Sequence, residues 1–74
     1  MHIEVHLFAT LREGRFHRKT LELPPGSNVG DICQQLGIGA GEVAIVMVNG
    51  SATFRDCTLK AGDEVSLFPV IGGG

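Results

Sequence analysis

Residues 24–37 read PPGSNVGDICQQLG, and this stretch decides the fold because it separates strand-like sequence from helix-like sequence. The two prolines cannot donate to a β-ladder and Gly26 permits a reversal, so the preceding strand must end here. Asn28 is a good helix N-cap, and Asp31 lies near the positive end of the helix dipole. Apolar residues follow at the spacing of an amphipathic helix, namely Val29, Ile32, Cys33 and Leu36. Gly37 stands where a left-handed residue would end this helix.

Upstream of the helix, the sequence predicts a hairpin of two strands. Residues 2–7 alternate polar and apolar side chains, which is typical of a half-buried strand, and we expect Phe8 and Ala9 to extend it. We expect Leu11 to cap the core near the polar turn at residues 12–15. Residues 16–23 then form the second strand, with leucines on its inner face.

Downstream, residues 43–48 are apolar throughout and rich in β-branched side chains. This composition predicts a central strand that is covered on both faces or nearly so. Asn49-Gly50 is a hairpin signal, with a short edge strand expected at residues 51–54. Residues 65–68 form the last strand, and Pro69 ends its capacity to pair as a central strand. The order predicts an α+β domain over residues 1–68, a mixed sheet of four to five strands with one main helix on one face.

Composition restricts the function. The chain has 74 residues, 43% of them hydrophobic, so it makes one small folded domain. A net charge of −2 provides no footprint for nucleic acid, and no apolar run exceeds six residues, which predicts neither a membrane span nor a secretory signal. Two cysteines are too few for an iron–sulfur cluster. We therefore expect a cytoplasmic protein without a required Cys33–Cys57 disulfide.

The C-terminal residues 69–74 form a chemically distinct tail. Three terminal glycines cost conformational entropy when ordered and bury no side chain, so they are poor packing residues. They suit a thread that passes through a narrow channel and presents the Gly74 carboxylate to another protein's active site. A merely frayed end is the alternative, and the apolar pair Val70-Ile71, which could anchor on a partner, favours the thread.

Four segments carry a resemblance that extends over nearly the whole chain. They are residues 5–13 (VHLFATLRE), residues 23–29 (LPPGSNV), residues 48–50 (VNG) and residues 61–65 (AGDEV), followed by the Gly-Gly end. In this order the chain resembles the MoaD/ThiS family of ubiquitin-like sulfur carriers, which implies the β-grasp fold. The opening is similar to the small subunit of molybdopterin synthase, whereas the triple glycine is similar to ThiS of thiamin thiazole synthesis.

The resemblance implies that the chain is a co-substrate rather than an enzyme, with no bound cofactor. An E1-like enzyme would adenylate Gly74 with ATP, and a sulfur donor would convert the acyl-adenylate to a thiocarboxylate. Gly72 and Gly73 would thread into the partner's active site. The recipient would be the larger subunit of molybdopterin (or tungstopterin) synthase, or alternatively thiazole synthase. Cysteine synthesis and tRNA thiolation also remain as pathways.

Two other classes of function stay open from sequence. One is a protein modifier that forms isopeptide bonds through Gly74, and the other is a non-covalent binding module. For the sulfur carrier and for both of these classes we expect an apolar partner surface continuous with the tail, comprising Phe8, Phe68, Pro69, Val70 and Ile71. The alternative for Phe8 and Phe68 is burial in the core. We expect no metal site, because His2 and His6 are about 13 Å apart along a strand and cannot share one ion.

Overall fold

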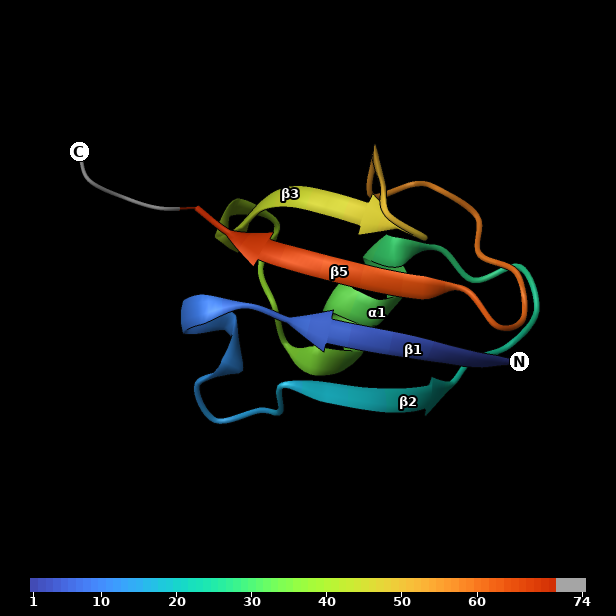
Figure 1. The fold of residues 1–74 in the computed structure, drawn as a ribbon, viewed down its shortest axis with the longest axis horizontal. Helices are drawn as coiled ribbons and strands as arrows, with labels where there is room; N and C mark the ends of the chain where they lie inside the picture. Colours follow the sequence, from blue (N-terminus) through green and yellow to red (C-terminus); the bar gives the residue numbers. More distant parts are fainter. Residues whose placement is uncertain (71–74) are drawn as a thin grey trace.

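A computed structural model describes residues 1–70 and shows a five-stranded mixed sheet with helix α1 packed across one face (Figure 1). The elements in chain order are β1 (His2–Leu7), a 3-10 turn (Ala9–Arg12), β2 (Arg18–Glu22), α1 (Val29–Leu36), a second 3-10 turn (Ala40–Glu42), β3 (Val43–Val48), β4 (Ser51–Thr53) and β5 (Glu64–Pro69). The strands are ordered β2-β1-β5-β3-β4 across the sheet. β1 and β5 are parallel neighbours, and the other pairs are antiparallel. The predicted α+β class and opening hairpin are confirmed.

Helix α1 begins and ends where its sequence predicts. The Asp31 backbone N–H donates to the Asn28 side-chain oxygen at 2.9 Å, and the Asn28 backbone N–H donates to the Asp31 carboxylate at 2.9 Å. Together these bonds form a reciprocal cap. Gly37 ends the helix with a φ of 71°, in the left-handed region that favours glycine. These caps fix the register of the helix, so its apolar stripe faces the sheet.

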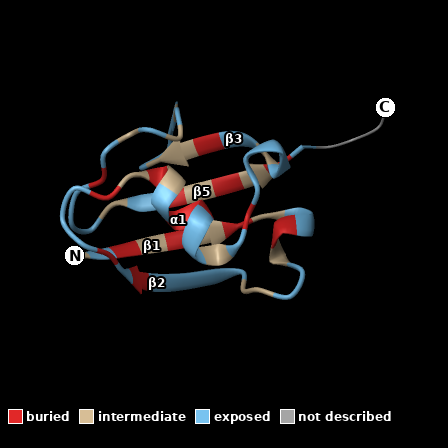
Figure 2. Cartoon of the chain, turned by 180° about the vertical axis from the view of Figure 1, so that it is seen from behind, coloured by how far each residue is buried: buried red, intermediate tan, exposed pale blue. Residues whose placement is uncertain are grey.

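The core is one layer of side chains between α1 and the sheet. Figure 2 views the molecule from the helix side, with buried segments along β1, β5 and β3 behind α1. Alternate residues of β1 and β5 point into this layer, which leaves their other side chains on the opposite face. The buried apolar residues are Ile3, Val5, Leu7, Leu11, Leu21, Leu23, Val29, Ile32, Cys33, Ile38, Val46, Leu59, Val65 and Leu67.

The prediction that residues 43–48 are covered on both faces is wrong. Only Val46 of β3 is buried, while Ala44 and Ile45 are exposed. β4 pairs with β3 only from Val46 onward, so the first half of β3 lies at an open edge. Within residues 1–70, no helix covers the sheet face opposite α1, and we call this surface the open face.

The prediction that Phe8 and Ala9 extend the first strand is also wrong. β1 ends at Leu7, and Ala9 adopts a φ of 49°, which turns the chain into the 3-10 segment. This reversal places Leu11 at the end of the sheet, where it is buried in the core as predicted. At the end of β5, Pro69 pairs with Val43 on one side only, consistent with its missing N–H.

Two further predictions concern membrane-spanning segments and the two cysteines. None of the described helices is long and apolar enough to cross a membrane. Cys33 is buried in the core, as its place on the helix stripe predicts, and burial raises the pKa of its thiol. Cys57 is half-buried, and both cysteines are free.

Candidate functional site

The first part of the candidate site is an aromatic pair at the end of the sheet where β5 ends. Leu7 of β1 is in register with Leu67 of β5, so the next residues, Phe8 and Phe68, lie side by side. Their rings stack with centroids 4.3 Å apart and an interplanar angle of 15°. Both side chains are half-buried on the open face. Phe8 and Phe68 were predicted from the sequence to contact a partner, and the structure brings them together.

Ile45 extends this aromatic pair, although the sequence analysis did not select it. It is the cross-strand partner of Phe68, and 51% of the residue's surface is exposed. Directly opposed residues of antiparallel strands share a face. The apolar row therefore consists of Phe8, Phe68 and Ile45, on β1, β5 and β3. The sequence did contain a signal for an exposed apolar residue on β3, because a single predicted helix of two turns can cover only one face of a sheet.

Arg12 fixes one end of the apolar row. Its Nε donates to the Leu7 carbonyl at 2.8 Å, and its guanidinium carbon lies 5.5 Å from the centroid of the Phe8 ring. A cation at this distance is attracted by the face of the ring. Arg12 thus holds Phe8 in place and adds a positive charge beside the apolar row.

The chain leaves the sheet directly after this row. Pro69 is buried, so its ring faces the core rather than the open face, although it was expected to contact a partner. Val70 is 54% exposed, and its amide donates to the Glu42 carbonyl at 3.2 Å. Ile71 and the glycines Gly72, Gly73 and Gly74 lie outside the described residues. The last described contacts hold the base of the tail at the end of β5.

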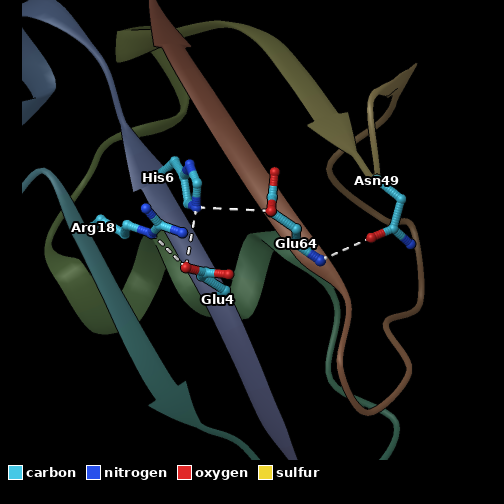
Figure 3. Close-up of polar contacts among 5 residues, drawn as sticks. All are labelled: Glu4, His6, Arg18, Asn49 and Glu64. Atoms are coloured by element: carbon cyan, nitrogen blue, oxygen red, sulfur yellow. Dashed lines mark hydrogen bonds and ion pairs between the residues drawn. The ribbon is translucent and has the colours of Figure 1, made fainter.

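A polar cluster lies on the same face, farther toward the N-terminal ends of β1 and β5 (Figure 3). Glu4 and Glu64 are in register, and His6 is two residues beyond Glu4. Arg18 on β2 donates from its Nε to Glu4, and this hydrogen bond holds the pKa of the Glu4 carboxyl below its usual value. The open face therefore has an apolar half beside the tail and a charged half away from it.

Asn49 and Asp63 join two of the segments on which the family resemblance rests. The Asn49 amide nitrogen donates to Asp63 at 2.9 Å, and the Glu64 backbone amide donates to the Asn49 side-chain oxygen at 2.9 Å. Asp63 also accepts from the Lys60 amide at 2.8 Å. The Lys60 amide first, and then Asn49, lower the pKa of Asp63. These bonds tie the β3–β4 hairpin to the start of β5.

The architecture is that of a ubiquitin-like β-grasp domain that carries an apolar sheet surface at the base of a glycine-ended tail. Comparison with protein families makes the assignment more specific. The sequence profile of the ThiS family matches residues 5–74, nearly the whole length, and the chain belongs to this family. The glycine end lies within the matched range, which agrees with the MoaD/ThiS resemblance drawn from the sequence segments.

Solved structures with the same fold include proteins from Haloferax volcanii and Pyrococcus furiosus. SAMP1, the small archaeal modifier protein 1 of Haloferax volcanii, is 26% identical, with 100% of both chains covered and a TM-score of 0.76. A putative molybdopterin converting factor subunit 1 from Pyrococcus furiosus is 26% identical over 93% of this chain and 97% of its own, with a TM-score of 0.75. The HVO 2177 protein of Haloferax volcanii is 30% identical over 100% of this chain and 87% of its own, with a TM-score of 0.80.

Proposed function

We propose that this chain is a cytoplasmic sulfur carrier whose Gly74 carboxylate is activated and converted to a thiocarboxylate. The observation that carries the proposal is the match to the ThiS family, which extends through the terminal glycines. The described fold adds a physical reason. β5 is paired on both sides, with β1 and β3, so it gives the tail a firm base.

The chemistry requires activation because a carboxylate is a poor electrophile. In the proposed reaction, a Gly74 carboxylate oxygen attacks the α-phosphorus of ATP, and pyrophosphate leaves. A sulfur nucleophile, sulfide or a donor persulfide, then attacks the acyl carbon of the adenylate, and AMP leaves with that carboxyl oxygen. With sulfide the thiocarboxylate forms directly, whereas with a persulfide it is released by a reductant. The carrier supplies only the acyl group. The partner enzyme supplies the catalytic groups and holds the reacting atoms close together.

In this proposal the apolar row binds the partner enzymes. Phe8, Phe68 and Ile45 form a contiguous apolar surface, and Val70 is exposed beside the exit of the tail. Exposed apolar patches on small domains mark interaction surfaces, and aromatic residues dominate binding energy at such surfaces. An E1-like enzyme and a sulfur-accepting enzyme would each bind this row while Gly72 and Gly73 thread toward their active sites.

Molybdopterin (or tungstopterin) synthesis is the pathway we favour within this chemistry. The relative from Pyrococcus furiosus is named as subunit 1 of a molybdopterin converting factor, and the segment at residues 5–13 resembles such subunits. The recipient would then be a larger catalytic subunit. Thiazole synthase is the alternative recipient, which the family's own designation favours.

A protein modifier is the second candidate function, because one relative is named as a small archaeal modifier. Both functions begin with adenylation of Gly74, so the test must examine the products. Incubation with the E1-like enzyme of the same host, ATP and sulfide should yield a Gly74 that reacts with a thioacid-specific alkylating reagent. Covalent conjugates that survive reductant and denaturant would instead assign the modifier function. An unreacted tail would leave the non-covalent binding module.

A further inference from the structure

The polar cluster on the open face brings together three groups that are metal ligands in other proteins. The parallel pairing of β1 and β5 places Glu4 opposite Glu64, and His6 extends from the same face of β1 (Figure 3). From the sequence, we considered only the two histidines of one strand, His2 and His6, and expected no metal site. Glu64 is 58 residues away from His6 in the chain, so only the fold reveals this neighbour.

We propose that Glu4, His6 and Glu64 form a binding site for a divalent transition-metal ion of the zinc class. This inference is independent of the proposed sulfur-carrier function. The His6 Nε2 lies 3.4 Å from Glu4 Oε1 and 3.9 Å from Glu64 Oε2, and one ligand atom from each residue lies within 4.8 Å of the others. Tetrahedral zinc with bonds of about 2.0–2.2 Å holds its ligand atoms roughly 3.3–3.6 Å apart.

The spacing therefore fits a tetrahedral site after a small movement of Glu64. That side chain is 48% exposed, so it has room to move toward the ion. The Glu4 and His6 atoms already lie at the required separation.

The state of His6 distinguishes this cluster from an ordinary pair of surface carboxylates. Its side chain is only 20% exposed, and its buried Nε2 atom, although 3.4 Å from Glu4 Oε1, makes no well-aligned hydrogen bond to any described residue. A buried polar nitrogen without a partner is costly, and such groups in native proteins call for an explanation. The lone pair of a neutral imidazole nitrogen is a common metal ligand, so a metal ion would satisfy this atom.

Arg18 sets the charge of the site and gives the proposal a directional test. The site combines two carboxylates and one guanidinium, which together carry one negative charge. Arg18 donates to Glu4 Oε1, the same oxygen that faces His6, so both this hydrogen bond and the positive charge of Arg18 oppose a cation there. We therefore expect weak binding in the wild-type protein and tighter binding when Arg18 is neutralised.

The donor set favours zinc-class ions over magnesium or calcium. One imidazole nitrogen with two carboxylates suits Zn²⁺, Co²⁺ or Ni²⁺, whereas Mg²⁺ and Ca²⁺ prefer six or more oxygen ligands. Three protein ligands also leave one position open for water or for a side chain from a docked partner. The site lies on the same open face as the apolar row, so a bound ion would face any partner that covers the sheet.

The test is calorimetric titration of the full chain with Zn²⁺, supported by the visible absorption of Co²⁺. We expect one ion per chain and a Co²⁺ spectrum of four-coordinate type. His6→Gln and Glu64→Gln should each weaken binding by at least about tenfold. Arg18→Gln should tighten it. His2→Gln is the matched control, because His2 lies on the same face of β1 and its Nε2 is 3.8 Å from Glu22, outside the cluster. It should leave the affinity within about twofold.

Several results would overturn the proposal. They are the absence of Zn²⁺ binding at millimolar concentration, equal affinities for the wild type and His6→Gln, and equal losses from His2→Gln and His6→Gln. Amide spectra of each variant confirm that it is folded, and Glu64→Gln supplies a second test at an exposed position if His6→Gln unfolds. Paramagnetic broadening by Co²⁺ centred on residues 4–6 and 64 is expected. Broadening centred on the chain termini would assign the ion to terminal groups and refute the site.

Discussion

Replacing Phe68 with alanine should separate partner binding from stability. Half-burial of the Phe68 ring removes roughly 100 Å² of apolar surface from water, which at about 25 cal/mol per Å² is worth roughly 2.5 kcal/mol as an upper estimate. We therefore expect Phe68→Ala to lower the free energy of unfolding by about 2 kcal/mol. A domain of 74 residues has about 4–11 kcal/mol, so the variant should still fold.

The matched control is Val65→Ala, which lies on the same strand but points into the core. Val65 is fully buried, and removing two methyl groups there costs about 2–3 kcal/mol including the cavity. The two variants should therefore show similar losses of stability, about 8–16 °C in Tm for a loss of 2 kcal/mol. Their partner binding should differ, because only Phe68 belongs to the apolar row.

The assay is the Kd for the E1-like enzyme of the same host, measured by calorimetry at a temperature where all variants are folded. A central aromatic contact is worth about 2 kcal/mol or more, so Phe68→Ala should raise the Kd about 30-fold. Val65→Ala should bind as the wild type does. The reasoning is refuted if Phe68→Ala binds with wild-type affinity, or if Val65→Ala loses affinity to the same degree.

Three further predictions test the tail and the bonds around β5. Deletion of Gly73 and Gly74 should abolish thiocarboxylate formation, measured by alkylation and intact mass. The Tm should stay within about 2 °C, because the described strands end at Pro69. A large fall in Tm would show that the tail packs on the domain. Asn49→Ala removes two side-chain hydrogen bonds and should lower urea stability by about 1–2 kcal/mol, whereas an unchanged midpoint would show that the bonds contribute nothing. Because the folded-state pKa of Asp63 is depressed below its ordinary value of 3.8, its contribution is present above that pH and is lost as the pH falls through the folded pKa. Asp63→Asn should therefore lose less free energy of unfolding than the wild type between about pH 5 and pH 2, as measured by urea titrations at each pH. Identical pH profiles for the two proteins would contradict this account.

Much of the fold follows from local sequence. Asn28, Asp31 and Gly37 fix both ends of the helix, because capping depends only on neighbouring residues. Asn49-Gly50 predicts the β3–β4 hairpin, and both residues adopt the positive φ values that a two-residue turn requires. Alternation in residues 2–7 identifies the strand and its inner face.

The open face could not be predicted in the same way. A run of apolar residues such as 43–48 does not say which faces of a strand are covered, since that depends on where the helix lies. Ile45 is exposed because α1 covers only the opposite face, and Phe8 is stacked because β1 and β5 pair in parallel. The juxtaposition of His6 with Glu64 has the same origin, since non-local pairing brings the two residues together.

The proposed sulfur-carrier function depends on Gly74 as the acyl site. The most direct measurement is to incubate the full chain with the E1-like enzyme of its host, ATP and sulfide, then to alkylate thioacids and map the product by mass spectrometry. Mapping is essential because replacement of oxygen by sulfur changes the mass almost as oxidation of Met1 or Met47 would. The account predicts an alkylated thiocarboxylate at Gly74 that requires ATP. An unmodified C-terminus, under conditions that charge a known carrier with the same enzyme, would contradict it.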